Sequence, residues 1–149
     1  MDHVVYIDTK EGDLEKLLDG TKSMIIRGAT GRKLPYGRVQ VGDRFYFIHN
    51  DGKCLVKASA VVSMVINSEK LSPQESSQLI EKYQDQLQLT PKQFNHWAGK
   101  RFLVLMGLDE VQSVIPFTID RSEYGNMDDW LPVGDIQRVK VVNSKFIIS

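Results

Sequence analysis

A run of basic side chains near the N-terminal end is the feature of this sequence best suited to chemistry. Only Asp43 opposes its six cations, which are Lys22, Arg27, Arg32, Lys33, Arg38 and Arg44. Ammonium and guanidinium groups donate charge-assisted hydrogen bonds to phosphates and to the edges of bases. Lys22 and Arg27 lie on an expected strand and its lead-in, where they project either into a ligand cleft or, as the alternative, into solvent at a strand end. The run predicts a site for an anionic ligand.

A tyrosine stands among these cations in the turn-rich segment 31–37. Arg32, Lys33 and Arg38 surround Tyr36. Loops that combine an aromatic ring with cations are suited to stacking on unpaired bases and to attracting a nucleic-acid backbone. The alternative is a basic turn packed by its own tyrosine.

The charge reverses between residues 109 and 130, where six acids stand against Arg121 alone. The formal net charge of the chain is zero. The two segments either steer an anionic ligand towards one face or pair with each other. The polar stretch 119–130 also contains Tyr124 and Trp130, which are candidate stacking surfaces of a lid opposite the basic loop, although Trp130 is also suited to plugging the core.

Several other site types find little support in the residues. His3, His49 and His96 lack the spacing of zinc ligands, so no metal site and no cofactor are expected. The segment 28–33 is rich in glycine but lacks the Gly-Lys-Ser/Thr ending of a phosphate loop. Cys54 begins an apolar strand face, where a buried and inert thiol is expected.

The elements that must position these residues follow from periodicity and turn residues. Alternating apolar positions and β-branched runs predict about seven strands, at 4–7, 24–26, 44–49, 54–66, 101–108, 111–119 and 136–142, with 146–148 as a last edge strand. Leucines predict a helix over 13–18. Two Ser/Thr-Pro-x-Glu/Gln capping boxes, at 72–75 and 90–93, predict two more helices. Strands with helices inserted between them indicate an α+β fold.

Length and composition are those of one folded domain over residues 1–149, with 42% hydrophobic and 26% charged residues. No apolar run is long enough to span a bilayer, and the first residues lack the features of a secretory signal. A single cysteine fits a reducing compartment. The expected location is therefore the cytoplasm, without a membrane partner.

The stretch Gly20 to Arg27, followed by Val39-Gln40-Val41-Gly42-Asp43, resembles the opening of ASCH-type domains of the PUA-like superfamily. In that family a Gly-x-Lys-Thr-x-Glu-x-Arg stretch leads to a Val-x-x-Gly-Asp turn. The resemblance implies a small mixed or antiparallel β-barrel with inserted helices. It carries Lys22, Ser23 and Arg27 over as functional residues, whereas Ile25 stands where the family has a glutamate. The family is associated with RNA-linked roles, and some small members resemble amidohydrolases acting on modified cytidine.

The sequence thus favours an RNA- or nucleotide-binding domain with a cleft between the basic loop and the aromatic, acidic loop. Its predicted binding residues are Lys22, Ser23, Arg27, Arg32, Lys33, Tyr36, Arg38, Tyr124 and Trp130. Two other functions stay open. One is a small amidohydrolase acting on a modified nucleoside, in which a desolvated Lys22 serves as base or activates Ser23, and Ile25 argues against it. The other is a protein-interaction module. The oligomeric state is not predicted.

Overall fold

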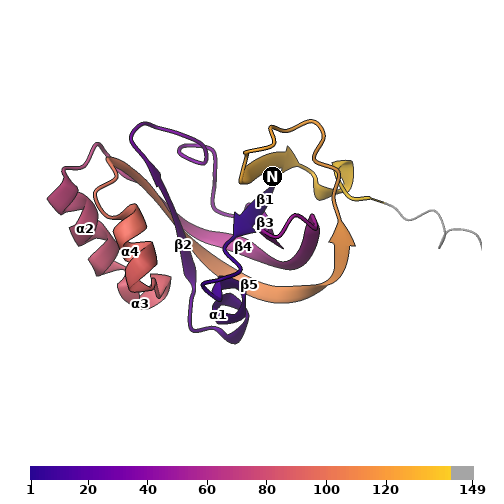
Figure 1. Cartoon of the computed structure of the whole chain (residues 1–149), viewed down its shortest axis with the longest axis horizontal. Coiled ribbons are helices and arrows are strands. Elements are labelled where there is room, and N and C mark those ends of the chain that lie inside the picture. The colour runs from indigo at the N-terminus through magenta and orange to yellow at the C-terminus, as the bar shows by residue number, and fades with distance from the viewer. Residues whose placement is uncertain (142–149) are drawn as a thin grey trace, which may run out of the picture.

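A computed structural model describes residues 1–141 and shows a curled, mixed sheet with helices on its outside (Figure 1). Its strands are β1 (Asp2–Ile7), β2 (Met24–Ala29), β3 (Arg44–His49), β4 (Leu55–Asn67), β5 (Phe102–Thr118) and β6 (Trp130–Gly134). Its helices are α1 (Asp13–Asp19), α2 (Pro73–Lys82), α3 (Gln84–Leu87) and α4 (Pro91–Trp97), with a 3-10 turn η1 at Ile136–Arg138. The predicted α+β class is confirmed. None of the helices within these residues is long and apolar enough to cross a membrane.

The six strands are hydrogen-bonded in the order β2-β5-β4-β3-β1-β6 and form a half-barrel. β1 and β3 pair in parallel, and the other neighbours pair antiparallel. The predicted strands 44–49 and 54–66 form the antiparallel β3–β4 pair. Val56, Ala58, Ala60 and Val62 of β4 are buried at every second position, as the pattern predicts. The inner face of the curl forms the main core, which α1 plugs with Leu14 and Leu17.

The three later helices cover the outside of β2 and the first half of β5 (Figure 1). Both predicted capping boxes are present. Ser72 and Glu75 exchange hydrogen bonds at the start of α2, and Thr90 and Gln93 do so at the start of α4. These helices pack on Met24, Ile26, Leu103 and Leu105 through Ile80, Leu87 and Leu89.

The structure differs from the predicted strands in three places. The predicted strands 101–108 and 111–119 are one strand of 17 residues, which passes Asp109 and Glu110 because Glu110 adopts a φ of 50° within an irregular register. Within the predicted strand 136–142, residues 136–138 form η1. The strand β6 was not predicted, because its buried stretch from Trp130 to Val133 is short and directly follows a polar loop. The predicted edge strand 146–148 lies outside the described residues.

A buried histidine ties three distant segments together. Trp130 Nε1 donates a hydrogen bond to His3 Nδ1 at 3.1 Å, and His3 Nε2 lies 2.9 Å from Asp43 Oδ2. Because Nδ1 accepts, the ring proton must be on Nε2, which donates to Asp43. Burial lowers the pKa of His3 below its usual 6.5, and the neighbouring Asp43 opposes this only in part. His3 is therefore held as the neutral imidazole.

This arrangement predicts a loss of stability in mild acid. The folded-state pKa of His3 is depressed, so the unfolded chain takes up the proton first, and the free energy of unfolding should fall as the pH drops below about 6.5. His3→Gln cannot titrate and should show a smaller slope between pH 7 and pH 5 in urea denaturation. At pH 7 it should be less stable than the wild type by about 1–3 kcal/mol, because bonds to Trp130 and Asp43 are disturbed.

The matched control is His96→Gln, since His96 is exposed on α4 and has no such partners among the described residues. It should keep the slope of the wild type. Equal slopes for the wild type and His3→Gln would contradict a buried neutral histidine.

Candidate functional site

A cleft of about 1050 Å³ opens where the curled sheet is left unclosed. One wall comes from the ends of β1 and β2, through Tyr6, Ile7 and the segment from Ile25 to Arg27. The loop 8–13, the hairpin turn at 50–51 and Asp129 form its rim, and α4 forms the opposite wall. Its volume is at the upper end of the range for small-ligand sites.

Lys22 is the buried one of two cations in the wall of this cleft. It follows the end of α1 at Gly20, and its side chain is 2% exposed. The ammonium group donates to the carbonyl oxygen of Leu87, at the end of α3. Burial lowers the pKa of Lys22 from 10.5 to about 8, while Asp13 in the same cleft acts in the opposite direction. Lys22 therefore titrates within the range of pH that ligand-binding experiments can reach.

Arg27 is the second cation, and it bridges the two ends of the half-barrel. Its Nη2 donates to the carbonyl oxygen of Tyr6 on β1 at 2.5 Å, and its Nη1 donates to Ile26 at 2.9 Å. The guanidinium carbon lies 5.5 Å from the centre of the Trp130 ring on β6, within the range of a cation–π contact. The buried Nε atom has no hydrogen-bond partner within the described chain. Arg27 thus holds the seam together.

A carboxylate and an amide face these cations from the helical side. Gln93 Nε2 donates to both oxygens of Asp13, at 3.0 and 3.2 Å, while its Oε1 accepts from the backbone of Thr90. One glutamine therefore caps α4 and fixes the Asp13 carboxylate in the cleft. Further along α4, His96 and Trp97 also line the cleft. This wall offers amide, imidazole and indole groups to a ligand.

The charges that line the cleft are nearly balanced. Its four cations are Lys10, Lys22, Arg27 and Lys92, and its five acids are Asp8, Glu11, Asp13, Asp51 and Asp129. Most acids lie on the rim, whereas Lys22 is buried deep in the wall. Such a lining is suited to a ligand with both polar and anionic groups and is poorly suited to a long polyanion.

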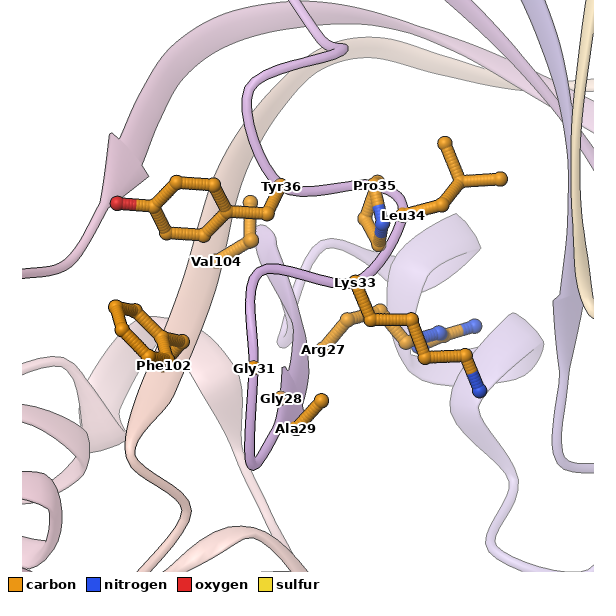
Figure 2. A pocket seen from close by; sticks show the side chains of 10 residues that line it. All are labelled: Arg27, Gly28, Ala29, Gly31, Lys33, Leu34, Pro35, Tyr36, Phe102 and Val104. Atoms are coloured by element: carbon orange, nitrogen blue, oxygen red, sulfur yellow. The ribbon is translucent and has the colours of Figure 1, made fainter. Parts of the chain in front are cut away.

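The basic loop lies beside the cleft rather than inside it. Together with Arg27 it lines a separate pocket of about 10 Å³, which has room for about one water molecule (Figure 2). Figure 2 shows Lys33 and Arg27 extending in the same direction, away from Tyr36. The Tyr36 hydroxyl donates to the carbonyl oxygen of Ser68 at 2.5 Å, and Arg32 lies over the Tyr36 and Phe102 rings.

The aromatic residues of the acidic segment also serve the fold. Trp130 is 2% exposed and plugs the core, as the alternative interpretation held. Tyr124 is half-buried against the cluster that includes Leu131 and Ile136. Of this segment, only Asp129 lines the cleft, and its charge raises the pKa of Arg27, which burial lowers. Among the described residues, no ion pair within 4 Å joins the acidic segment to the basic one.

The structure therefore brings together two of the nine predicted binding residues, Lys22 and Arg27. Ser23 is exposed outside the cleft lining, and the loop residues Arg32, Lys33, Tyr36 and Arg38 are also outside it. Sequence reasoning missed Asp13, Gln93, His96 and Trp97. Gln93 belongs to the predicted capping box at 90–93, and that role is compatible with lining the cleft. Among residues 1–141, no group of three His, Cys, Asp or Glu side chains is placed to hold a metal ion.

Comparison with solved structures identifies the architecture. The ASCH protein of Zymomonas mobilis superposes with a TM-score of 0.64 at 14% identity, covering 87% of this chain and 85% of that one. A point mutant of the same protein gives the same score and covers 87% of both chains. No protein-family model and no curated protein matches the sequence. The fold is therefore that of an ASCH domain, as the motifs predicted.

The bridging role of Arg27 predicts that it stabilises the fold. Arg27→Met removes the bonds across the seam and should lower the free energy of unfolding by about 1–3 kcal/mol, as expected for hydrogen bonds from a charged donor. Arg27→Lys should recover only part of this loss, because an ammonium lacks the planar fork of a guanidinium. Urea denaturation measures both. Arg38→Met is the control, since Arg38 is exposed, and it should change stability little. A similar small effect for Arg27→Met would refute the bridge.

Proposed function

We propose that this ASCH-type domain binds a nucleotide-like ligand, either free or as an unpaired residue of RNA, in the cleft at the seam of its half-barrel. Two cations in the wall of one large cleft, the buried Lys22 and the half-buried Arg27, carry the proposal. A desolvated cation binds an anionic group more strongly than a solvated one, since little water screens it. Lys22 and Arg27 would hold the anionic part of the ligand.

The opposite wall is suited to a heterocyclic base. The indole of Trp97 and the imidazole of His96 lie with ring centres 4.4 Å apart at the cleft, and rings of this kind stack on bases. The Gln93 amide, held by Asp13, offers polar groups to a base edge. The nearly balanced charge of the lining favours a single nucleotide unit over a long strand. The basic loop next to Arg27 would attract the backbone that flanks such a unit in RNA.

The remaining parts of the proposal concern the chain as a whole. We take residues 1–149 as one domain in the cytoplasm. The single cysteine, Cys54, is free and half-buried, which is consistent with a reducing compartment.

Binding can be tested by titrating nucleoside monophosphates and a short single-stranded RNA, with calorimetry as the readout. Lys22→Met should weaken both ligands at least about tenfold, because a charge-assisted hydrogen bond contributes about 1.5–3 kcal/mol. Lys33→Met is the matched control for the mononucleotide, since Lys33 is exposed outside the cleft. Mononucleotide affinities that are equal in the wild type and Lys22→Met would exclude the cleft.

The loop can be separated from the cleft by charge reversal. Arg32→Glu, Lys33→Glu and Arg38→Glu combined should lower the affinity for RNA and flatten its salt dependence, because fewer counterions are released. Mononucleotide binding should be unchanged. RNA binding that ignores this reversal would show that the loop makes no backbone contact.

The pKa of Lys22 gives a further prediction. Lys22 is charged below about pH 8 and loses its proton above it, so affinity for a nucleoside monophosphate should fall between pH 7 and pH 9. The phosphate, whose second pKa is about 6, keeps its charge in this window. In Lys22→Met the affinity should be lower at pH 7 and nearly flat to pH 9. A wild-type affinity that stays constant across the window would contradict a contact between the ligand anion and Lys22.

A hydrolytic reaction on a modified nucleoside is the second candidate. It is favoured by an amine with a pKa of about 8 that shares a cleft with the Asp13 carboxylate. Asp13 would supply the acid that Ile25 does not. Ser23 lies outside the cleft lining, which leaves Lys22 as the base. A screen of modified nucleosides with the wild type and Lys22→Ala decides the matter, because equal background turnover in both would exclude this mechanism.

A further inference from the structure

One carboxylate of the cleft, that of Asp13, is held in a fixed orientation and keeps acceptor positions open. Gln93 Nε2 donates to Asp13 Oδ2 at 3.0 Å and to Oδ1 at 3.2 Å. The oxygen of the same amide accepts the N–H of Thr90 in the capping box of α4, so the amide cannot turn over without losing its bonds at both ends. An ionised carboxylate offers about four acceptor positions, and one amide nitrogen occupies at most two of them.

The remaining acceptor positions of Asp13 have no partner among residues 1–141. No further hydrogen bond reaches this carboxylate within that part of the chain, and no lysine or arginine nitrogen lies within 4 Å of it. The carboxylate is nevertheless close enough to Lys22 and Arg27 to raise the pKa of each, against the effect of burial. Asp13 therefore lies between the cations of one wall and Gln93 of the other.

The rings suited to stacking come from the same face of α4 as Gln93. Gln93, His96 and Trp97 are at positions i, i+3 and i+4 of this helix, and all three line the cleft. A base stacked on either ring turns an edge along the helix towards Gln93 and Asp13, while a phosphate on the same nucleotide reaches the wall with Lys22 and Arg27. The edge of the base then meets a carboxylate, which can only accept hydrogen bonds.

We propose that Asp13 makes the cleft selective for guanine, by accepting two parallel hydrogen bonds from N1–H and the 2-amino group of the base. This inference rests on the proposed function, because it names the base that the nucleotide site takes. Guanine alone among the four common bases presents two adjacent donors on its Watson–Crick edge. Adenine and cytosine place a ring-nitrogen acceptor beside their amino group, and uracil flanks its N–H with two carbonyl oxygens. An acceptor that faces the carboxylate loses its hydrogen bonds to water and gains none in return.

Calorimetric titration of guanosine, inosine and adenosine monophosphate tests this selectivity. The wild type should bind guanosine monophosphate at least about tenfold more tightly than the other two, because a hydrogen bond to a charged group contributes about 1.5–3 kcal/mol. Inosine monophosphate differs from the guanine ligand only by the missing 2-amino group, so this pair isolates one of the two bonds. Asp13→Asn should bring all three affinities within about threefold of one another, because the amide has a single acceptor oxygen, which Gln93 already engages.

The matched control is Asp51→Asn, which makes the same change of charge at an exposed position on the rim of the same cleft. It should keep the wild-type ratio of guanosine to inosine monophosphate affinity. The ratio compares ligands on one variant, so a loss of stability alone does not change it. The wild-type series also decides without any variant.

Each outcome separates this inference from the proposed function. Equal binding of the three nucleotides by the wild type overturns the selectivity and leaves the nucleotide site standing. An Asp13→Asn variant that keeps the wild-type ratio assigns the discrimination to another group and also overturns the inference. Absence of binding by all three nucleotides overturns the proposed function, and the inference with it.

Discussion

The structure depends on how the two ends of a curled sheet are held together without sheet hydrogen bonds. β2 lies at one end of the strand order and β1 with β6 at the other, so the backbone ladder cannot close the half-barrel. Arg27 joins them instead, by a hydrogen bond to Tyr6 and a contact with the Trp130 ring. A single side chain reaches across only part of this seam. The part of the seam that it leaves open is the cleft, so the same gap in the sheet accounts for the half-barrel and for the candidate site.

The two cations at the seam, Lys22 and Arg27, carry an energetic cost that the fold offsets only in part. Removing a charge from water costs several kcal/mol, and neutral side chains would close a seam with less loss. Arg27 and Lys22 regain part of that cost from the carbonyl oxygens of Tyr6 and Leu87. The unpartnered Nε of Arg27 leaves the rest uncompensated. An anionic ligand in the cleft would offset part of the cost that Lys22 and Arg27 pay for their removal from water.

Sequence reasoning succeeded where the determinants are local. The two capping boxes, the β3–β4 pair and the helix predicted over 13–18 are each set by a few neighbouring residues, and all of them are present. It failed where strand formation depends on which distant segment is available to pair. Asp109 and Glu110 suggested a break, yet β4 holds β5 together past them. The predicted strand over 136–142 became η1, with Ile136 buried against β6, because no strand of the described chain pairs with residues 136–138.

The candidate site shows the same division. Lys22 and Arg27 were predicted because they belong to a short sequence motif. Asp13 and Gln93, which line the same cleft, are separated by 80 residues in the chain and meet only because α4 folds over β2. Local charge was a poorer guide, because a basic run says nothing about which side its members face. Arg27 faces inwards to the seam, while Arg32 lies over rings of its own neighbourhood and Arg38 is exposed. The direction of each side chain, set by the curl of the sheet, therefore decides which cations belong to the cleft.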